Sequence, residues 1–513
     1  MLIQTSLAAL GLFSSTFGSE HLPRRRCAYG DECWPDVETW NSFNATIGGR
    51  LIRSLPSAAV CHAERYNADK CATAKDSWLD SFWKTNQSGA YAATLWEMGD
   101  TGRCFIDTPL DAPCDQGIVP YYSVRAQSIE DIQASVKFAS EKDLYLVTKN
   151  TGHDHLGRSS GKGAFSIWTH NLKGIEWHNS FIQMGAPKDA NGVPAVTLQA
   201  GEQWFDVYRA AAKQKVLVVG GSARTVGAAG GYLLGGGHSP FAHDYGLAVD
   251  KMSIVSADGK HHVINQHSDP DYFWAVRGGG GSAWGIVTSV TYKTHPVPKN
   301  MIFGFVQLNA SDNSSLTHLL SESIKLLPNV TGAGYTGYGD MSHGFQAIFL
   351  KPNSTVKSFN ETFAGFFNLT QYPVFTENSK SEDLAKLLVR NGGGGFNFIG
   401  RVNNDHRDET AVNEIWKQSN ALMSISIDWA DNATMSEKHE KRLHAVQISK
   451  DLTEIVGQEG GTYINEANPY EPDWQKVFWG KKYERLAEIK KRIDPTGFFV
   501  CNRCVGGNLV LDP

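Results

Sequence analysis

The first regular pattern of hydrophobic residues lies between residues 119 and 147. An apolar run at 119–124 predicts a strand, and a second run at 144–147 predicts another. Between them, apolar residues recur at helical spacing over 129–139, directly after Ser128. With Asp131 three residues on, Ser128 resembles a helix N-cap signal. The pattern therefore predicts a strand–helix–strand unit of α/β type.

The same patterning continues downstream and changes character near residue 298. We expect a helix at 204–212 and strands at 216–219, 254–256, 262–264 and 286–294. Asp258-Gly259 falls between two of these strands and is typical of a hairpin turn. Pro296 and Pro298 mark a domain boundary. Beyond it, strands at 303–308, 347–350 and 423–427 and a helix at 314–327 predict an antiparallel sheet with helices on one face.

Two glycine-rich stretches interrupt these elements. Residues 150–161 follow the strand at 144–147 and contain His153 and Arg158. Backbone N–H groups of such a loop can form an anion cradle, and the arginine suits a phosphate. By itself the loop is equally typical of a plain surface loop with a solvated histidine. The second stretch, 220–238, is so rich in glycine that its backbone is expected to lie against a flat, extended ligand.

Composition limits the class of protein. A chain of 513 residues exceeds one ordinary hydrophobic core, so two or more domains are expected. The net charge is -5 and no basic stripe is present, which argues against nucleic acid as a partner. No later stretch is long and apolar enough to span a membrane. The apolar run at 7–13 predicts a signal peptide over residues 1–18.

Cysteines and glycosylation sequons also favour the secretory pathway. The chain has eight cysteines, six of them before residue 115, and short spacings would allow pairs such as Cys61–Cys71 and Cys104–Cys114. For Cys501 and Cys504 we favour a structural disulfide over a redox or metal site. N-x-S/T sequons occur at Asn44, Asn86, Asn309, Asn313, Asn329, Asn353, Asn360, Asn368 and Asn432.

Taken together, four segments resemble the FAD-linked oxidases of the berberine-bridge-enzyme type, in the vanillyl-alcohol-oxidase superfamily, and most of all the fungal branch. They are residues 150–161, 220–238, 271–287 and 463–499. The resemblance implies FAD as cofactor, bound covalently through His153. Many relatives with a doubly attached flavin have a cysteine where this chain has Ala223, so a single bond is expected. The implied cofactor-binding residues are Asn150, Thr151, Gly152, His153, Asp154, Arg158, Ser159, Gly221, Ser222, Thr225, Gly227, Gly231, Gly236, His238 and Ile286.

The predicted fold class is α+β. It comprises a PCMH-type FAD-binding domain of two α/β subdomains and a substrate domain with an antiparallel sheet backed by helices. The expected parts are a signal peptide (1–18), a cysteine-rich N-terminal region (19–115), the FAD-binding domain (116–298), the substrate domain (299–455) and a C-terminal segment that returns to the FAD-binding domain (456–513). We find no catalytic motif in the N-terminal region. Gly278-x-Gly280-x-x-Ala283 follows no strand, which disfavours a nicotinamide site.

The resemblance places the catalytic machinery near the C-terminus. Many relatives have a tyrosine base where this chain has Glu466. Glu466 could act as the base if burial raises its pKa toward neutrality, and the alternative is a solvated or salt-bridged side chain. Tyr463 either orients the substrate or the flavin, or packs as a core residue.

We expect a secreted, monomeric oxidase that transfers hydride from a small-molecule substrate to FAD, with O2 as acceptor and H2O2 as product. An alcohol or a secondary-metabolite intermediate is favoured as substrate. The alternatives are an oxidative cyclase of a natural-product pathway and a flavin-binding protein without turnover. No metal is expected, because His153-Asp154-His155 and His261-His262 lack the spacing of a zinc site.

Overall fold

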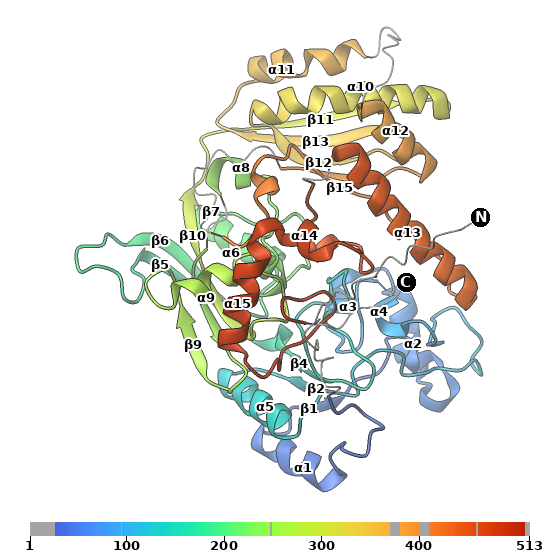
Figure 1. Cartoon of the computed structure of the whole chain (residues 1–513), viewed down its shortest axis with the longest axis vertical. Helices are drawn as coiled ribbons and strands as arrows, with labels where there is room; N and C mark the ends of the chain where they lie inside the picture. The colour runs from blue at the N-terminus through green and yellow to red at the C-terminus, as the bar shows by residue number, and fades with distance from the viewer. Residues whose placement is uncertain are drawn as a thin grey trace, which may run out of the picture.

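The computed structural model describes residues 26–93, 95–246, 249–369, 380–399, 410–457 and 460–507. Three sheets organise these residues, and their layers are visible in Figure 1. The predicted signal peptide lies outside the described residues. Within them, no helix is both long and apolar enough to cross a membrane.

The first sheet has four strands in the order β1-β2-β4-β3. Strands β2 and β3 both pair with β4 in parallel, and β1 adds to β2 antiparallel. The strands are β1 (Leu51–Arg53), β2 (Tyr122–Arg125), β3 (Leu146–Lys149) and β4 (Phe165–Trp168). Helix α5 (Ile129–Glu141) connects β2 to β3, and Ser128 and Asp131 form a capping box at its start. The predicted strand–helix–strand unit is therefore confirmed.

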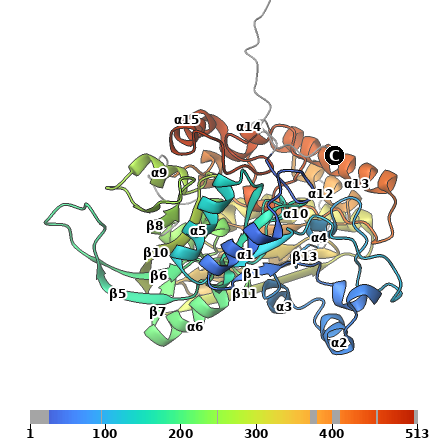
Figure 2. The same cartoon turned by 90° about the horizontal axis from the view of Figure 1, so that it is seen from below.

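The second sheet is antiparallel, in the order β5-β6-β10-β8-β9, and β7 pairs with the far end of β10. The hairpin of β5 and β6 projects from the body in both overall views (Figures 1 and 2). The strands are β5 (Ile175–Phe181), β6 (Val193–Gln199), β7 (Val216–Val218), β8 (Val249–Val255), β9 (His261–Ile264) and β10 (Ile286–Pro296). The short helices near this sheet are α6 (Trp204–Gln214), α7 (Gly231–Leu234), α8 (Ala242–Tyr245) and α9 (Pro270–Ala275).

The third sheet has the antiparallel architecture that was predicted for the residues after 298. Its order is β11-β13-β12-β14-β15, and every pairing is antiparallel. Helices α10 and α11 lie over one face (Figure 1) and share with it a core that includes Phe345, Phe349 and Phe363. The strands are β11 (Met301–Asn309), β12 (Thr336–Asp340), β13 (Gly344–Pro352), β14 (Gly395–Phe398) and β15 (Leu422–Ser424). The helices are α10 (Asn313–Gly332), α11 (Val356–Asn368), α12 (Lys380–Arg390) and α13 (Met435–Val456).

Both ends of the described chain pack on the first two sheets. Helices α14 (Trp474–Trp479) and α15 (Tyr483–Ile493) contribute Trp479 and Leu486 to the core of the second sheet. At the other end, α1 (Val37–Thr46) packs against α5 through stacked rings of Phe43 and Phe138. The remaining N-terminal helices are α2 (Ala68–Asp76), α3 (Ser81–Thr85) and α4 (Leu95–Met98).

All eight cysteines form disulfides: Cys27–Cys33, Cys61–Cys71, Cys104–Cys114 and Cys501–Cys504. The two local pairs that the spacing allowed are therefore present. Cys501 and Cys504 form a buried structural link rather than half of a metal site.

Candidate active site

A cavity of about 1550 Å³ lies where the three sheets and the N-terminal region meet. The glycine-rich loops of the first two sheets form one wall. Strands β12, β14 and β15 and helix α13 form the opposite wall, and parts of residues 78–105 close one side. This volume exceeds the roughly 300–1,000 Å³ of an ordinary small-ligand site. It can therefore hold an extended cofactor together with a second molecule.

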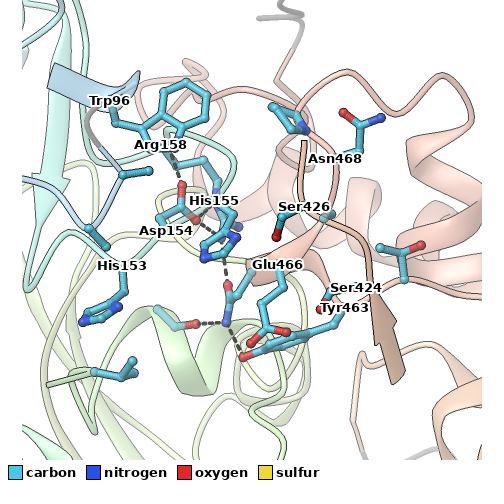
Figure 3. Close-up of a pocket in the computed structure, with 18 of the residues that line it drawn as sticks. Trp96, His153, Asp154, His155, Arg158, Ser424, Ser426, Tyr463, Glu466 and Asn468 are labelled. Atoms are coloured by element: carbon cyan, nitrogen blue, oxygen red, sulfur yellow. Dashed lines mark hydrogen bonds and ion pairs between the residues drawn. The ribbon is translucent and has the colours of Figure 1, made fainter. Parts of the chain in front are cut away.

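His153 lies in the loop that follows β3. Its Nε2 is 2.8 Å from the hydroxyl oxygen of Thr225, and no other hydrogen bond to the ring is found among the described residues. Burial, reinforced by His155 and Lys149, lowers the pKa of His153 to about 4. The imidazole is therefore neutral near pH 7 and retains an unshared electron pair. Figure 3 shows the ring on the side of the cavity formed by the loops, across from Ser424 and Ser426.

Lys149, the last residue of β3, connects the start of this loop to the N-terminal region. Its ammonium group donates to the backbone oxygens of Gln87 (2.6 Å) and Ser88 (3.1 Å) and lies over the ring of Tyr91. Burial lowers the pKa of Lys149 to about 7, although Glu97 nearby opposes the shift. The lysine thus ties the N-terminal region to the base of the loop.

Arg158 is occupied by protein groups. Asp154 accepts from its backbone N–H at 2.6 Å and from Nε at 2.7 Å, and also pairs with Nη2. The same Nη2 donates to the side-chain oxygen of Asn465 at 2.8 Å. Only Nη1 is buried without a partner among the described residues. Arg158 therefore links the loop to the C-terminal segment, while its Nη1 remains without a protein partner among the described residues.

Asn465 joins three parts of the site. It accepts from Arg158, and its amide donates to the backbone oxygen of Gly231 at 2.8 Å and to the hydroxyl of Tyr463 at 2.7 Å. Its backbone oxygen also accepts from the N–H of His155 at 3.2 Å. These bonds fix the C-terminal segment against both glycine-rich stretches.

The second glycine-rich stretch presents bare backbone to the cavity. A Cβ placed on Gly230 or Gly231 would have no protein atom within 4 Å, although both residues line the cavity. A Cβ on Gly227 would instead lie 2.1 Å from the side-chain nitrogen of Asn150. Ala223 is exposed in the cavity wall. The space before Gly230 and Gly231 therefore suits a ligand that touches the backbone.

Glu466, in a 3₁₀ turn (Ile464–Glu466), faces the cavity (Figure 3). Nε2 of His238 is 3.0 Å from its Oε1, and the amide of Asn397 donates to Oε2 at 3.4 Å. Burial pushes the pKa of Glu466 upward, but the contacts with His238, His155 and Asn397 outweigh burial and hold it below its usual value. The raised pKa on which the sequence-based role of Glu466 depended is not found, because of this polar cluster. Glu466 is an anion at neutral pH.

Two tyrosines border this cluster. Tyr463 is buried, and burial raises its pKa far above its usual value, so its hydroxyl stays protonated. Its ring contacts Trp416 and His238. On β12, the Tyr338 hydroxyl lies 3.4 Å from Nδ1 of His238, and burial raises the pKa of Tyr338 to about 12. Both hydroxyls stay protonated and do not act as bases.

Helix α13 lines the wall opposite the loops with one face. That face changes from basic to apolar and hydroxyl-bearing along the helix. Its cavity residues are Lys438, Lys441, Arg442, Ala445, Ile448, Ser449, Leu452, Thr453 and Val456. At the basic end, Arg442 pairs with Asp100 and Lys438 donates to the backbone oxygen of Asp100 at 3.2 Å. These contacts close the cavity between α13 and the N-terminal region.

Asn502 and Arg503, which we call the clamp, bind two segments of the site to each other through hydrogen bonds. Between the paired cysteines 501 and 504, Asn502 donates to the backbone oxygens of Leu156 (3.2 Å) and Pro469 (3.1 Å). Arg503 donates to the backbone oxygen of Glu471 at 2.8 Å. The clamp therefore joins the loop that contains His153 to the segment that contains Glu466.

Most of the residues predicted from the sequence do line the cavity. They are Asn150, Thr151, Gly152, His153, Asp154, Arg158, Ser159, Gly221, Ser222, Gly227, Gly231, His238, Tyr463 and Glu466. Three others lie behind its wall. Thr225 contacts His153, a Cβ on Gly236 would meet Val412 at 2.7 Å, and Ile286 is buried in the core of the first sheet.

The sequence did not single out Tyr338, Asn397, Asn465 or helix α13. Tyr338 lies between two glycines, and Asn397 comes two positions after a run of four, so no strand was predicted at β12 or β14. A signal for α13 was present. Thr434 and Glu437 form a capping box at its start, and this spacing is visible in the sequence.

Comparison with known proteins relates both ends of the site to described families. Residues 120–265 match the FAD binding domain family, and residues 462–505 match the berberine and berberine-like family. An uncharacterized FAD-linked oxidoreductase of Arthroderma benhamiae is 52% identical over 99% of both chains. The FAD-linked oxidoreductase patO of Aspergillus clavatus is 33% identical and aligns with 98% of this chain and 95% of its own.

Among solved structures, the VAO-type flavoprotein MtVAO615 of Myceliophthora thermophila C1 superposes with a TM-score of 0.83. It is 25% identical, and the match covers 94% of this chain and 97% of that chain. The α+β architecture predicted from the sequence is thus also that of a known flavoprotein.

Proposed function

Because the chain belongs to the berberine-bridge-enzyme-like group of FAD-linked oxidoreductases, we propose that it oxidises a small organic molecule, an alcohol or a natural-product intermediate. The observation that carries this proposal is one continuous cavity with His153 in one wall and the polar cluster of Glu466 in another. When bound, FAD would accept a hydride from the substrate and pass two electrons to O2, which gives H2O2. The protein would position the substrate and accept its proton.

The residues present fit a flavin with a single covalent bond. Gly230 and Gly231 leave open space against the backbone, and buried Nη1 of Arg158 has no partner among the described residues. His153 is neutral, and Thr225 occupies one ring nitrogen, so the other is free to bond to the cofactor. Ala223 has no thiol for a second bond.

The polar cluster supplies the acid–base chemistry. Oxidation of an alcohol releases the O–H proton as the hydride leaves carbon, so an acceptor must lie beside the substrate. Anionic Glu466 and its partner His238 provide that acceptor, while the protonated Tyr338 hydroxyl can donate a hydrogen bond to the substrate oxygen.

We also propose passage through the secretory pathway. Four disulfides are typical of an oxidising compartment. All the sequons except Asn44, which is half-buried, have an exposed asparagine.

The test is to express the protein in a eukaryotic secretory host, precipitate it in acid and measure flavin absorbance in the pellet and the supernatant. Yellow protein with flavin on a peptide that contains His153 would support the tether. His153→Ala should release the flavin, whereas the matched control His155→Ala should retain it. Flavin in the supernatant alone would reject the covalent bond, and no flavin in either fraction would reject the oxidase.

A second measurement addresses turnover. Anaerobic addition of candidate alcohols to the yellow protein should bleach the flavin, and air should restore the colour with release of H2O2. A bound flavin that none of the candidates reduces would favour a flavin-binding protein without turnover.

A further inference from the structure

Three consecutive glycines, at positions 235–237, precede His238, which lines the cavity. A Cβ on Gly235 would lie 2.4 Å from the amide nitrogen of Asn465, and one on Gly237 would lie 2.4 Å from the ring of Tyr232. Gly236 and Gly237 also have φ values of 108° and 60°, which other residues rarely adopt. The close contacts of Gly235 and Gly237 are with protein side chains rather than with the open cavity. They fix the backbone before His238, so that its ring lies against Glu466.

The two ring nitrogens of His238 have different partners. Nε2 lies 3.0 Å from Oε1 of Glu466, whereas the one partner of Nδ1 among the described residues is the Tyr338 hydroxyl, at the longer distance of 3.4 Å. Asn397 lies 3.4 Å from Nε2 and from Oε2 of Glu466, which restrains both side chains. The ring thus presents Nδ1 as an available proton acceptor, with an anion bound to its opposite nitrogen.

We propose that His238, rather than Glu466, takes the proton from the substrate, and that Glu466 is a positioning residue that orients the ring and stabilises the imidazolium. This inference rests on the proposed oxidase function. The substrate O–H proton would pass to Nδ1 of His238, the hydride from the same carbon would pass to FAD, and a C=O bond would form. The proton leaves to solvent before the next turnover.

The charges around the cluster support this assignment. Glu466 has a lowered pKa, and a strongly acidic carboxyl is a poor proton acceptor but a good counter-ion. Imidazole is the side chain that ordinarily changes charge between pH 5 and 8. The other ionisable groups facing His238 are the hydroxyls of Tyr338 and Tyr463, and the raised pKa of each keeps it neutral. His155 acts on Glu466 from the loop of His153.

The decisive experiment is the pH dependence of flavin reduction by a saturating substrate in stopped flow. In wild type the rate should rise with pH through one ionisation, as the proton acceptor loses its proton. His238→Gln should reduce the rate by about 10²–10⁴-fold and abolish that ionisation. Glu466→Gln should retain it at lower pH, because the imidazolium loses its counter-ion. The matched control His178→Gln, on β5 outside the cavity, should keep the wild-type profile.

Several outcomes would overturn the proposal. One is a wild-type profile in His238→Gln with a rate within a few-fold of wild type. Another is loss of the ionisation in Glu466→Gln alone, which would identify Glu466 as the base. If the two residues act as one unit, the double variant should be about as slow as the slower single variant, whereas multiplied losses would indicate independent roles.

A substrate-free measurement separates this inference from the oxidase itself. In ¹³C-histidine-labelled holoprotein, the resonance lost in His238→Gln should change position in Glu466→Gln, because the ring loses its charged partner. An unchanged resonance would overturn the pairing whether or not a substrate is found. Covalent flavin content, measured in every variant, reports separately on the proposed tether.

Discussion

The two long walls of the cavity are built in different ways. On the wall formed by residues 150–161 and 220–238, bare backbone and a few side chains with fixed partners face the interior. On the wall formed by α13 and strands β12, β14 and β15, ordinary side chains on regular elements face it. The first wall requires particular residues because many substitutions would collide with neighbouring protein atoms. Apart from Tyr338 and Asn397, which contact His238 and Glu466, the second requires only suitable size and polarity.

This difference separates what the protein shares with its relatives from what can distinguish it. The wall of glycine loops fits a flavin, which would be the same molecule in every member. The wall of α13 would meet the substrate, which differs between members. Substitutions on the two walls should therefore affect different measurements, and four variants test whether they do.

The largest effect is expected where the walls meet. Glu466→Gln keeps the shape of the side chain but removes its charge, so the proton acceptor loses its anion. Flavin reduction should slow by about 10²–10⁴-fold while covalent flavin content stays normal. Stopped-flow absorbance measures the first quantity, and acid precipitation measures the second. A normal reduction rate would remove Glu466 from the chemistry.

The next effect tests the backbone wall. In Gly231→Ala the added methyl group meets no protein atom within 4 Å, so it can make a steric clash only with a bound ligand. Overpacking of about 1–3 kcal/mol should reduce flavin incorporation roughly tenfold to a hundredfold without lowering the Tm of the apoprotein. Gly332→Ala, which also has open space around its Cβ, is the control. Equal flavin content in the two variants would show that FAD does not lie against Gly231.

A smaller effect is expected on the side-chain wall. Leu452→Ala enlarges the cavity on α13 and should lower kcat/KM for the preferred substrate by roughly tenfold, with flavin content unchanged. Leu443→Ala changes an exposed leucine of the same helix and should leave kcat/KM near its wild-type value. Loss of flavin in Leu452→Ala would contradict the separation of the two walls.

The smallest effect concerns the support beneath the His153 loop. The pKa of Lys149 is about 7 in the folded protein, so between pH 7 and 10 the unfolded chain binds the extra proton. The free energy of unfolding should therefore rise with pH, by no more than about 1.4 kcal/mol per unit. As the pH is raised from 7 to 10, the Tm of Lys149→Met should therefore fall by about 1–3 °C relative to the Tm of wild type. The exposed control Lys162→Met should show no such trend.

The elements that position the first wall were predicted well from the sequence. The capping box at Ser128 and the hairpin at Asp258-Gly259 are local signals, and the structure confirms both. The strands at 336–340 and 395–398 were missed because glycines weaken their pattern. Those glycines are explained only by partners distant in sequence. A Cβ on Gly337, for example, would lie 1.8 Å from the backbone oxygen of Ile348.

The same limit applies to the candidate site. His153 was singled out because its loop resembles that of a known family, whereas Asn465 was not, because its contacts are with Arg158, Gly231 and Tyr463. The low pKa of Glu466 was also unpredictable. Burial alone would raise it, and the opposing contact comes from His238, 228 positions away in the chain.

The clamp at Asn502 and Arg503 also sets an order for biosynthesis. It holds the loop of His153 against the segment of Glu466, and both clamp residues are translated long after that loop. Until Asn502 and Arg503 have left the ribosome, nothing in this pair of residues holds the loop of His153 against the segment of Glu466. The glycine-rich loops are therefore made well before the residues that fix their position.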